Sequence, residues 1–171
     1  MIKVYIGNLI PDVPHTEILY PNLGNKERET PFGESLFSHF VDPIVEIVPT
    51  AEAADYLCVP HNYNYVKTRI EYLAEFVELA EKHSKKILIF FPGDSDEEVP
   101  VPYSIVFRNS QYGYKKQENE IIMPGFAVDL GATYGLEERA KGEKPVVGFC
   151  GWASYTTVRE WISYVMVNLV E

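Results

Sequence analysis

Short apolar runs recur along the chain and predict buried strands. They cover residues 2–6, 45–48, 56–59, 87–91, 104–107 and 146–149, with a further short strand expected at 121–123. Most of these runs are apolar at consecutive positions rather than at alternate ones. That pattern is typical of parallel strands, which helices cover on both faces.

Helical periodicity lies between these strands. The clearest helix is expected at 65–82, on the stripe Val66, Ile70, Leu73, Val77 and Ala80. Shorter helices are expected at 33–40 and at 158–169, the second after Thr157 and Glu160 at capping-box spacing. Alternating strands and helices predict an α/β fold, a Rossmann-like parallel sheet flanked by helices, with residues 1–171 forming one domain.

Two longer segments break this alternation. Residues 7–30 are polar and rich in turn residues, and residues 108–120 are polar and aromatic, so both are expected to be loops. Long segments without a helical or strand period are usually functional or mobile. Because ligands of open α/β sheets bind at the carboxyl ends of strands, the sequence places candidate sites in the loops that follow strands.

Composition narrows the class of protein. The 171 residues are 46% hydrophobic and 13% aromatic, which describes an ordinary globular core. A formal net charge of −10 makes a nucleic acid or an anionic membrane an unfavourable partner. Neither a signal peptide nor an apolar stretch of the ~20 residues that cross a bilayer is visible, so a cytoplasmic location without membrane insertion is expected.

Cys58 and Cys150 lie in apolar runs and are expected to be reduced and buried.

Several catalytic signatures are missing from the sequence. It contains no Gly-x-Gly-x-x-Gly, Walker, Cys-x-x-Cys, His-Glu-x-x-His or Gly-x-Ser-x-Gly motif. This argues against a dinucleotide oxidoreductase, a P-loop NTPase, a zinc enzyme and an α/β-hydrolase. Asp94-Ser-Asp96 has the form of a paired-acid metal motif, but the same residues fit a sugar contact or a solvated turn, and no metal or other cofactor is expected.

Candidate site residues follow the predicted strands. His61 and Asn62 come after strand 56–59, where His61 fits a general base, and both also fit a turn that caps the next helix. Asp94 follows strand 87–91. Arg108 follows strand 104–107 and fits either a fork onto a ligand anion or an ion pair with Asp129 or another acid. Asn109, Tyr112 and Trp152 complete the candidate substrate-binding set.

Four segments in order resemble exostosin-like glycosyltransferases. They are Ala-Asp-Tyr-Leu-Cys-Val-Pro at 54–60, Lys-Ile-Leu-Ile-Phe-Phe-Pro-Gly-Asp at 86–94, Asn-Glu-Ile-Ile-Met-Pro at 119–124 and Lys-Pro-Val-Val-Gly-Phe-Cys-Gly at 144–151. The resemblance implies one lobe of a GT-B architecture, the N-terminal lobe that mainly carries the acceptor side. The family's donor-binding C-terminal lobe has no counterpart in the sequence.

The resemblance therefore implies transfer of a sugar from a nucleotide-sugar donor to a saccharide acceptor. His61 or Asp94 would deprotonate the acceptor hydroxyl, and Arg108 and Asn109 would help to hold the acceptor. We expect the chain alone to transfer no sugar, and part of its C-terminal helix to expose apolar surface that a second lobe or a second copy covers. The alternative is a non-catalytic α/β domain that binds a partner protein or a small ligand at the same edge of its sheet.

Overall fold

The structure is a computed structural model that describes residues 1–24 and 42–123. The elements expected at 33–40, 146–149 and 158–169, and the candidate Trp152, lie outside the described residues. In the described part, no helix is both long and apolar enough to cross a membrane.

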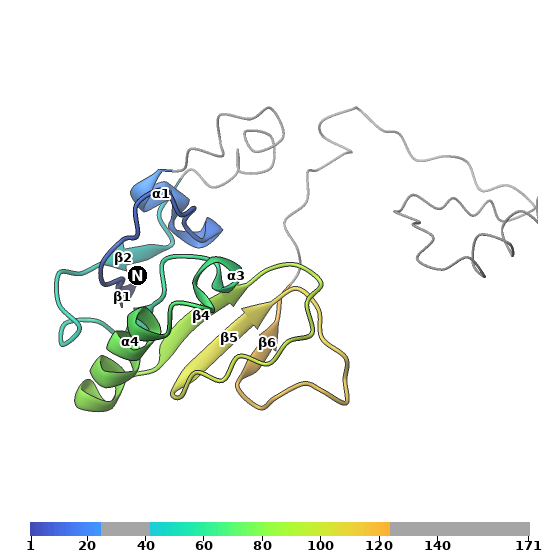
Figure 1. The fold of residues 1–171 in the computed structure, drawn as a ribbon. Helices are drawn as coiled ribbons and strands as arrows, with labels where there is room; N and C mark the ends of the chain where they lie inside the picture. Colours follow the sequence, from blue (N-terminus) through green and yellow to red (C-terminus); the bar gives the residue numbers. More distant parts are fainter. Residues whose placement is uncertain (25–41, 124–171) are drawn as a thin grey trace, which may run out of the picture. The chain divides into compact units, whose positions relative to one another are not determined.

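The described residues form a six-stranded sheet in the order β2-β1-β3-β4-β5-β6 (Figure 1). All five strand pairings are parallel. The strands are β1 (Ile2–Tyr5), β2 (Val45–Ile47), β3 (Tyr56–Cys58), β4 (Ile87–Phe91), β5 (Ser104–Arg108) and β6 (Glu120–Ile122). The expected α/β, Rossmann-like fold is therefore confirmed.

Strand β1 lies between β2 and β3, so the sheet grows in opposite directions on the two sides of β1. Ile2 is in register with Val45 on one side, and Val4 is in register with Tyr56 on the other. A reversal of this kind is the topological switch point at which open α/β sheets commonly bind ligands. Here it lies between the carboxyl ends of β1 and β3.

Alternate residues of the strands supply two separate cores. Leu57, Ile87 and Ile89 pack with α3 (Tyr63–Val66) and α4 (Ile70–His83) on one face. Because neighbouring strand residues point to opposite faces, Cys58 and Phe90 belong to the core on the other face. That second core also receives Leu19 from the segment formed by η1 (Glu17–Leu19) and α1 (Tyr20–Leu23). Both faces are thus covered, as the continuous apolar strands predict.

The helix expected at 65–82 is in fact two helices, α3 and α4 (Figure 1). Arg69, the residue before α4, has φ −93° and ψ 71° and so breaks the helical backbone. The break lets α3 bury Tyr63 against Phe91, with ring centroids 5.1 Å apart, while α4 buries its own stripe. Ile70, expected in the core, is 70% exposed, and Phe76 takes a core position instead.

The segment after β1 was expected to be a loop as far as residue 30, and this is wrong for residues 17–23, whereas residues 7–16 contain no helix and no strand of the sheet. Residues 17–23 are helical, and Leu19 and Tyr20 are buried. The turn that starts this segment depends on Gly7, which has φ +61°. A Cβ at this position would lie 2.9 Å from Cζ of Phe76, so the close approach of β1 to α4 requires glycine.

Candidate functional site

The predicted site residues within the described part of the chain lie at the carboxyl edge of the sheet, because each follows one of the parallel strands β3, β4 and β5. Their contacts divide this edge into two regions. The switch-point edge consists of residues 6–16 and 59–64, and the β4–β5 edge consists of residues 92–98 and 108–117. The structure places Arg108 in contact with the loop that carries Asp94, within the β4–β5 edge, and places His61 in the switch-point edge.

His61 is fully buried at the switch-point edge. Its Nε2 accepts a hydrogen bond from the backbone N–H of Ile10 at 3.0 Å, and its Nδ1 lies 3.0 Å from the carbonyl oxygen of Pro14. A carbonyl oxygen only accepts, so Nδ1 carries the proton and the ring is neutral. Burial, followed by repulsion from His15, lowers the pKa of His61. His61 therefore has no free ring nitrogen for a substrate proton in this arrangement.

Asn62 is buried beside His61 and directs its amide toward the segment after β1. Its Nδ2 donates to Oε1 of Glu17 at 3.4 Å, and it makes no side-chain cap for α3. The backbone N–H of Thr16 donates to the carbonyl oxygen of Pro60 at 2.7 Å. Residues of the chain itself thus engage both ring nitrogens of His61 and the amide nitrogen of Asn62, whereas Oδ1 of Asn62 is buried without a partner.

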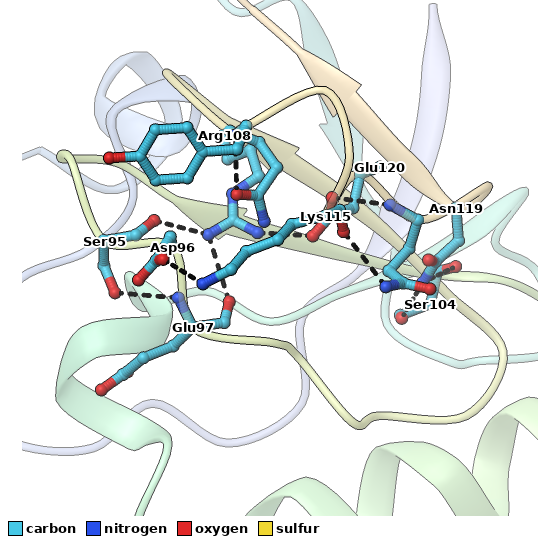
Figure 2. Close-up of polar contacts among 11 residues, drawn as sticks. Ser95, Asp96, Glu97, Ser104, Arg108, Lys115, Asn119 and Glu120 are labelled. Carbon is cyan, nitrogen blue, oxygen red and sulfur yellow. Dashed lines mark hydrogen bonds and ion pairs between the residues drawn. The ribbon is translucent and has the colours of Figure 1, made fainter.

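Arg108 is a buried residue that holds the loops of the β4–β5 edge through hydrogen bonds and an ion pair. It is fully buried at the end of β5, and its Nη1 donates to Oε1 of Glu120 at 2.5 Å (Figure 2). Its Nη2 donates to the carbonyl oxygens of Ser95 at 2.6 Å and Glu97 at 3.2 Å. The guanidinium carbon also lies 5.0 Å from the centroid of the Phe91 ring. Arg108 therefore fixes the loop after β4 to the start of β6.

This ion pair resolves one of the alternatives left open by the sequence: the acid is Glu120, which lies on the neighbouring strand. Glu120 is buried and also accepts from the backbone N–H of Gln117 at 3.0 Å, so it anchors the loop after β5 as well. Sequence reasoning missed this residue because it treated 108–120 as one loop. An acid at the head of the short apolar run Glu-Ile-Ile was the available signal.

The outer layer of the β4–β5 edge is polar and exposed. Lys115 pairs with Asp96 across the two loops, and this pairing lowers the pKa of Asp96 and raises that of Lys115 (Figure 2). Asp94 is exposed and has no described partner. No group of three or more His, Cys, Asp or Glu side chains in the described residues is arranged to hold a metal ion.

Two tyrosine rings project from the loop after β5. Tyr112 is 58% exposed and Tyr114 is 82% exposed, and their rings stack with centroids 5.5 Å apart and an interplanar angle of 21°. The ammonium of Lys115 lies 5.9 Å from the Tyr112 centroid. Asn109, which lies between Arg108 and Tyr112 in the sequence, is half-buried. The edge thus combines exposed aromatic faces with amide and carboxylate groups, which suits an uncharged polar ligand that also has apolar faces.

No family model, curated protein or solved structure matches the chain. The candidate site is therefore described by its geometry alone.

Proposed function

We propose that this chain is the acceptor-side lobe of an exostosin-like glycosyltransferase, and that a saccharide binds at its β4–β5 edge. The observation that supports this most is the exposed, stacked pair Tyr112 and Tyr114 beside an ordered polar loop. Sugar rings have apolar faces that stack on aromatic rings and hydroxyl rims that need hydrogen-bond partners. A buried ion pair beneath the loops preorganises such a surface before the ligand arrives.

In this proposal Asp94 is the better placed of the two candidate bases. Its carboxylate is exposed, whereas both ring nitrogens of His61 are engaged. The carboxylate takes the proton of an acceptor hydroxyl while that oxygen attacks the anomeric carbon of the donor. The bond between the anomeric carbon and the donor phosphate breaks, and the nucleoside diphosphate leaves. The donor is held by a second lobe, because transfer requires both reactants in one site.

The binding half of the proposal is tested with the chain and a panel of neutral oligosaccharides, by calorimetry and by NMR of the tyrosine rings. Replacing Tyr112 with Ala is expected to weaken saccharide binding roughly 5- to 10-fold, since one stacking face is lost. The matched control is Tyr103→Ala, because Tyr103 is 43% exposed but precedes β5, at the opposite edge of the sheet. Equal losses in the two variants, or no binding by the unmodified chain, would refute a saccharide site at Tyr112.

The catalytic half is tested on the natural gene product by release of nucleoside diphosphate from nucleotide sugars. Asp94→Asn is expected to abolish transfer and to leave saccharide binding unchanged, because the amide cannot take a proton. Glu98→Gln is the control, since Glu98 is a nearby exposed acid without a described partner. Full activity in Asp94→Asn would remove Asp94 from the reaction.

One observation favours a second candidate function, a non-catalytic domain that binds a ligand or partner at the same edge. The chain itself engages polar groups at the switch point, where enzymes of this fold class commonly hold a ligand. Saccharide binding by the natural gene product, with no turnover of any nucleotide sugar, would support this candidate over the transferase.

A further inference from the structure

Unpartnered polar atoms are concentrated in one short stretch of the chain, at the β4–β5 edge. In the described part of the chain, five buried side-chain polar atoms have no hydrogen-bond partner. Three of them belong to the stretch 108–111: Nε of Arg108, Oδ1 of Asn109 and Nε2 of Gln111. An unsatisfied buried group costs about 1–3 kcal/mol, so native proteins keep few of them. The concentration indicates a place where an external group completes the hydrogen bonds.

The local structure shows why these atoms have no partner within the fold. Arg108 is fully buried, and both of its terminal nitrogens are used by Glu120, Ser95 and Glu97. Gln111 uses its Oε1 to accept from the backbone N–H of Tyr112 at 2.9 Å, which leaves its amide nitrogen without an acceptor. The amides of Asn109 and Gln111 stand two residues apart, immediately before the Tyr112 and Tyr114 rings.

The unpartnered atoms differ in kind, and this restricts the ligand. Oδ1 of Asn109 needs a donor, whereas Nε2 of Gln111 and Nε of Arg108 need acceptors. A phosphate or carboxylate only accepts and would leave Asn109 unpaired, and an ammonium only donates and would leave Gln111 unpaired. A hydroxyl group both donates and accepts, so it matches the two amides, whereas Nε of Arg108 belongs to a fully buried side chain and is left out of the ligand contacts.

The charges nearby point to the same class of ligand. Four acids lie within 94–98, of which Asp96 pairs with Lys115 and Glu97 with Lys67. Asp94 and Glu98 have no ion-pair partner among the described residues. The same edge also carries Lys116, an exposed cation, so the two free acids leave it negative by about one charge, which disfavours an anionic ligand but not a neutral one.

We propose that Asn109 and Gln111 form the hydroxyl-recognising half of the saccharide site and make it selective for neutral over acidic saccharides. The inference rests on the proposed saccharide binding at the Tyr112–Tyr114 pair and assigns its polar contacts. One sugar ring stacks on the tyrosines while its hydroxyls donate to Oδ1 of Asn109 and accept from Nε2 of Gln111. A small movement of the loop uncovers the two amides as the sugar enters.

The test is an NMR titration of the isotopically labelled chain with maltose, cellobiose and lactose, and separately with glucuronic acid and UDP. We expect the side-chain amide signals of Asn109 and Gln111 to shift with one or more of the neutral disaccharides, together with the Tyr112 ring. We expect glucuronic acid and UDP to leave them in place. A response of these amides to UDP or glucuronic acid alone would overturn the selectivity.

Variants separate this inference from the proposed function. Gln111→Glu keeps the acceptor used by Tyr112 but replaces the free donor with an acceptor, and we expect neutral disaccharides to bind roughly 5- to 10-fold more weakly. The matched control is Gln117→Ala, because Nε2 of Gln117 already donates to the carbonyl oxygen of Lys115. Wild-type affinity in Gln111→Glu, with binding lost in Tyr112→Ala, would refute the assignment of Gln111 and leave the saccharide site standing. No binding by the unmodified chain would refute both.

Discussion

The two regions of the carboxyl edge differ in whether their polar side chains are engaged by the chain or exposed to solvent. At the switch-point edge, the segment after β1 folds back and engages both ring nitrogens of His61 with its own backbone. At the β4–β5 edge, a single buried arginine holds the loops from beneath and leaves their outer surface polar and aromatic. At the switch point, where topology favours ligand binding, the chain thus engages His61 with its own backbone groups. The exposed aromatic and polar side chains lie instead at the β4–β5 edge.

The comparison shows that lying at the same sheet edge does not make residues one site. His61, Asp94 and Arg108 all follow parallel strands, as the sequence predicted. The described contacts nevertheless connect Arg108 to the loop that carries Asp94, and connect His61 to residues of the segment after β1. His61 and Arg108 therefore belong to different regions because their side chains form hydrogen bonds with different loops.

The largest expected effect tests whether the β4–β5 edge depends on its buried ion pair. Glu120→Ala leaves the Arg108 guanidinium buried without its carboxylate, which typically costs about 3–5 kcal/mol of unfolding free energy. Chemical denaturation followed by circular dichroism measures the loss. Glu118→Ala is the control, because Glu118 is exposed and should change stability by less than ~0.5 kcal/mol. Similar values for the two variants would show that the pair does not support this edge.

The next effect tests how tightly the switch-point edge is packed. Gly7→Ala places a methyl group 2.9 Å from Phe76 at a backbone with φ +61°, so strain and overpacking together should cost about 2–4 kcal/mol. Gly113→Ala is the control, because this glycine has no left-handed φ and a Cβ there meets nothing within 4 Å, so it should change stability by less than ~0.5 kcal/mol. The difference between their denaturation midpoints measures the combined cost of the backbone strain and the contact with Phe76. Equal midpoints would contradict the requirement for glycine at position 7.

A smaller effect tests the neutral His61. Burial lowers its pKa below 6.5 in the folded chain, so the unfolded chain binds the proton more readily. The stabilisation is complete above the unfolded pKa of about 6.5 and is lost as pH falls below it toward the folded value. Unfolding free energy measured across this interval should decrease with falling pH in the wild type, with a slope of at most about 1.4 kcal/mol per pH unit from this group. His61→Gln should show a flatter dependence, and an unchanged slope would contradict the role of the ring.

The smallest effect concerns the exposed ion pair of the β4–β5 edge. Lys115→Ala removes the partner of Asp96 at the surface, where solvent screens the charges. We expect no measurable change in unfolding free energy, in contrast with Glu120→Ala, which removes the buried partner of Arg108. The substitution should instead raise the pKa of the Asp96 carboxyl, because Lys115 lowers it in the wild type. Titration followed by NMR measures this pKa. A clear loss of stability would place Lys115 among the structural supports.

Much of the fold was determined by local pattern. The apolar runs at 45–48, 56–59, 87–91 and 104–107 matched strands to within a residue or two because a strand buried on both faces must be apolar at successive positions. The buried, unpaired state of Cys58 followed from the same pattern, and burial raises the pKa of its thiol to about 12. The break between α3 and α4 did not follow, because a helical stripe of apolar residues is compatible with one helix or two.

Tertiary structure alone decided which polar residues could face a ligand. The sequence identified His61, Asn62, Asp94, Arg108, Asn109 and Tyr112 as strand-end residues, since that depends only on neighbours in the chain. Whether each is engaged depends on partners far away in sequence: Ile10 and Pro14 for His61, and Glu120 for Arg108. Hydrogen bonds and ion pairs of this kind depend on which loops the folded sheet brings together. Periodicity thus fixes the strands that position a side chain, and only packing decides whether that side chain remains free to bind.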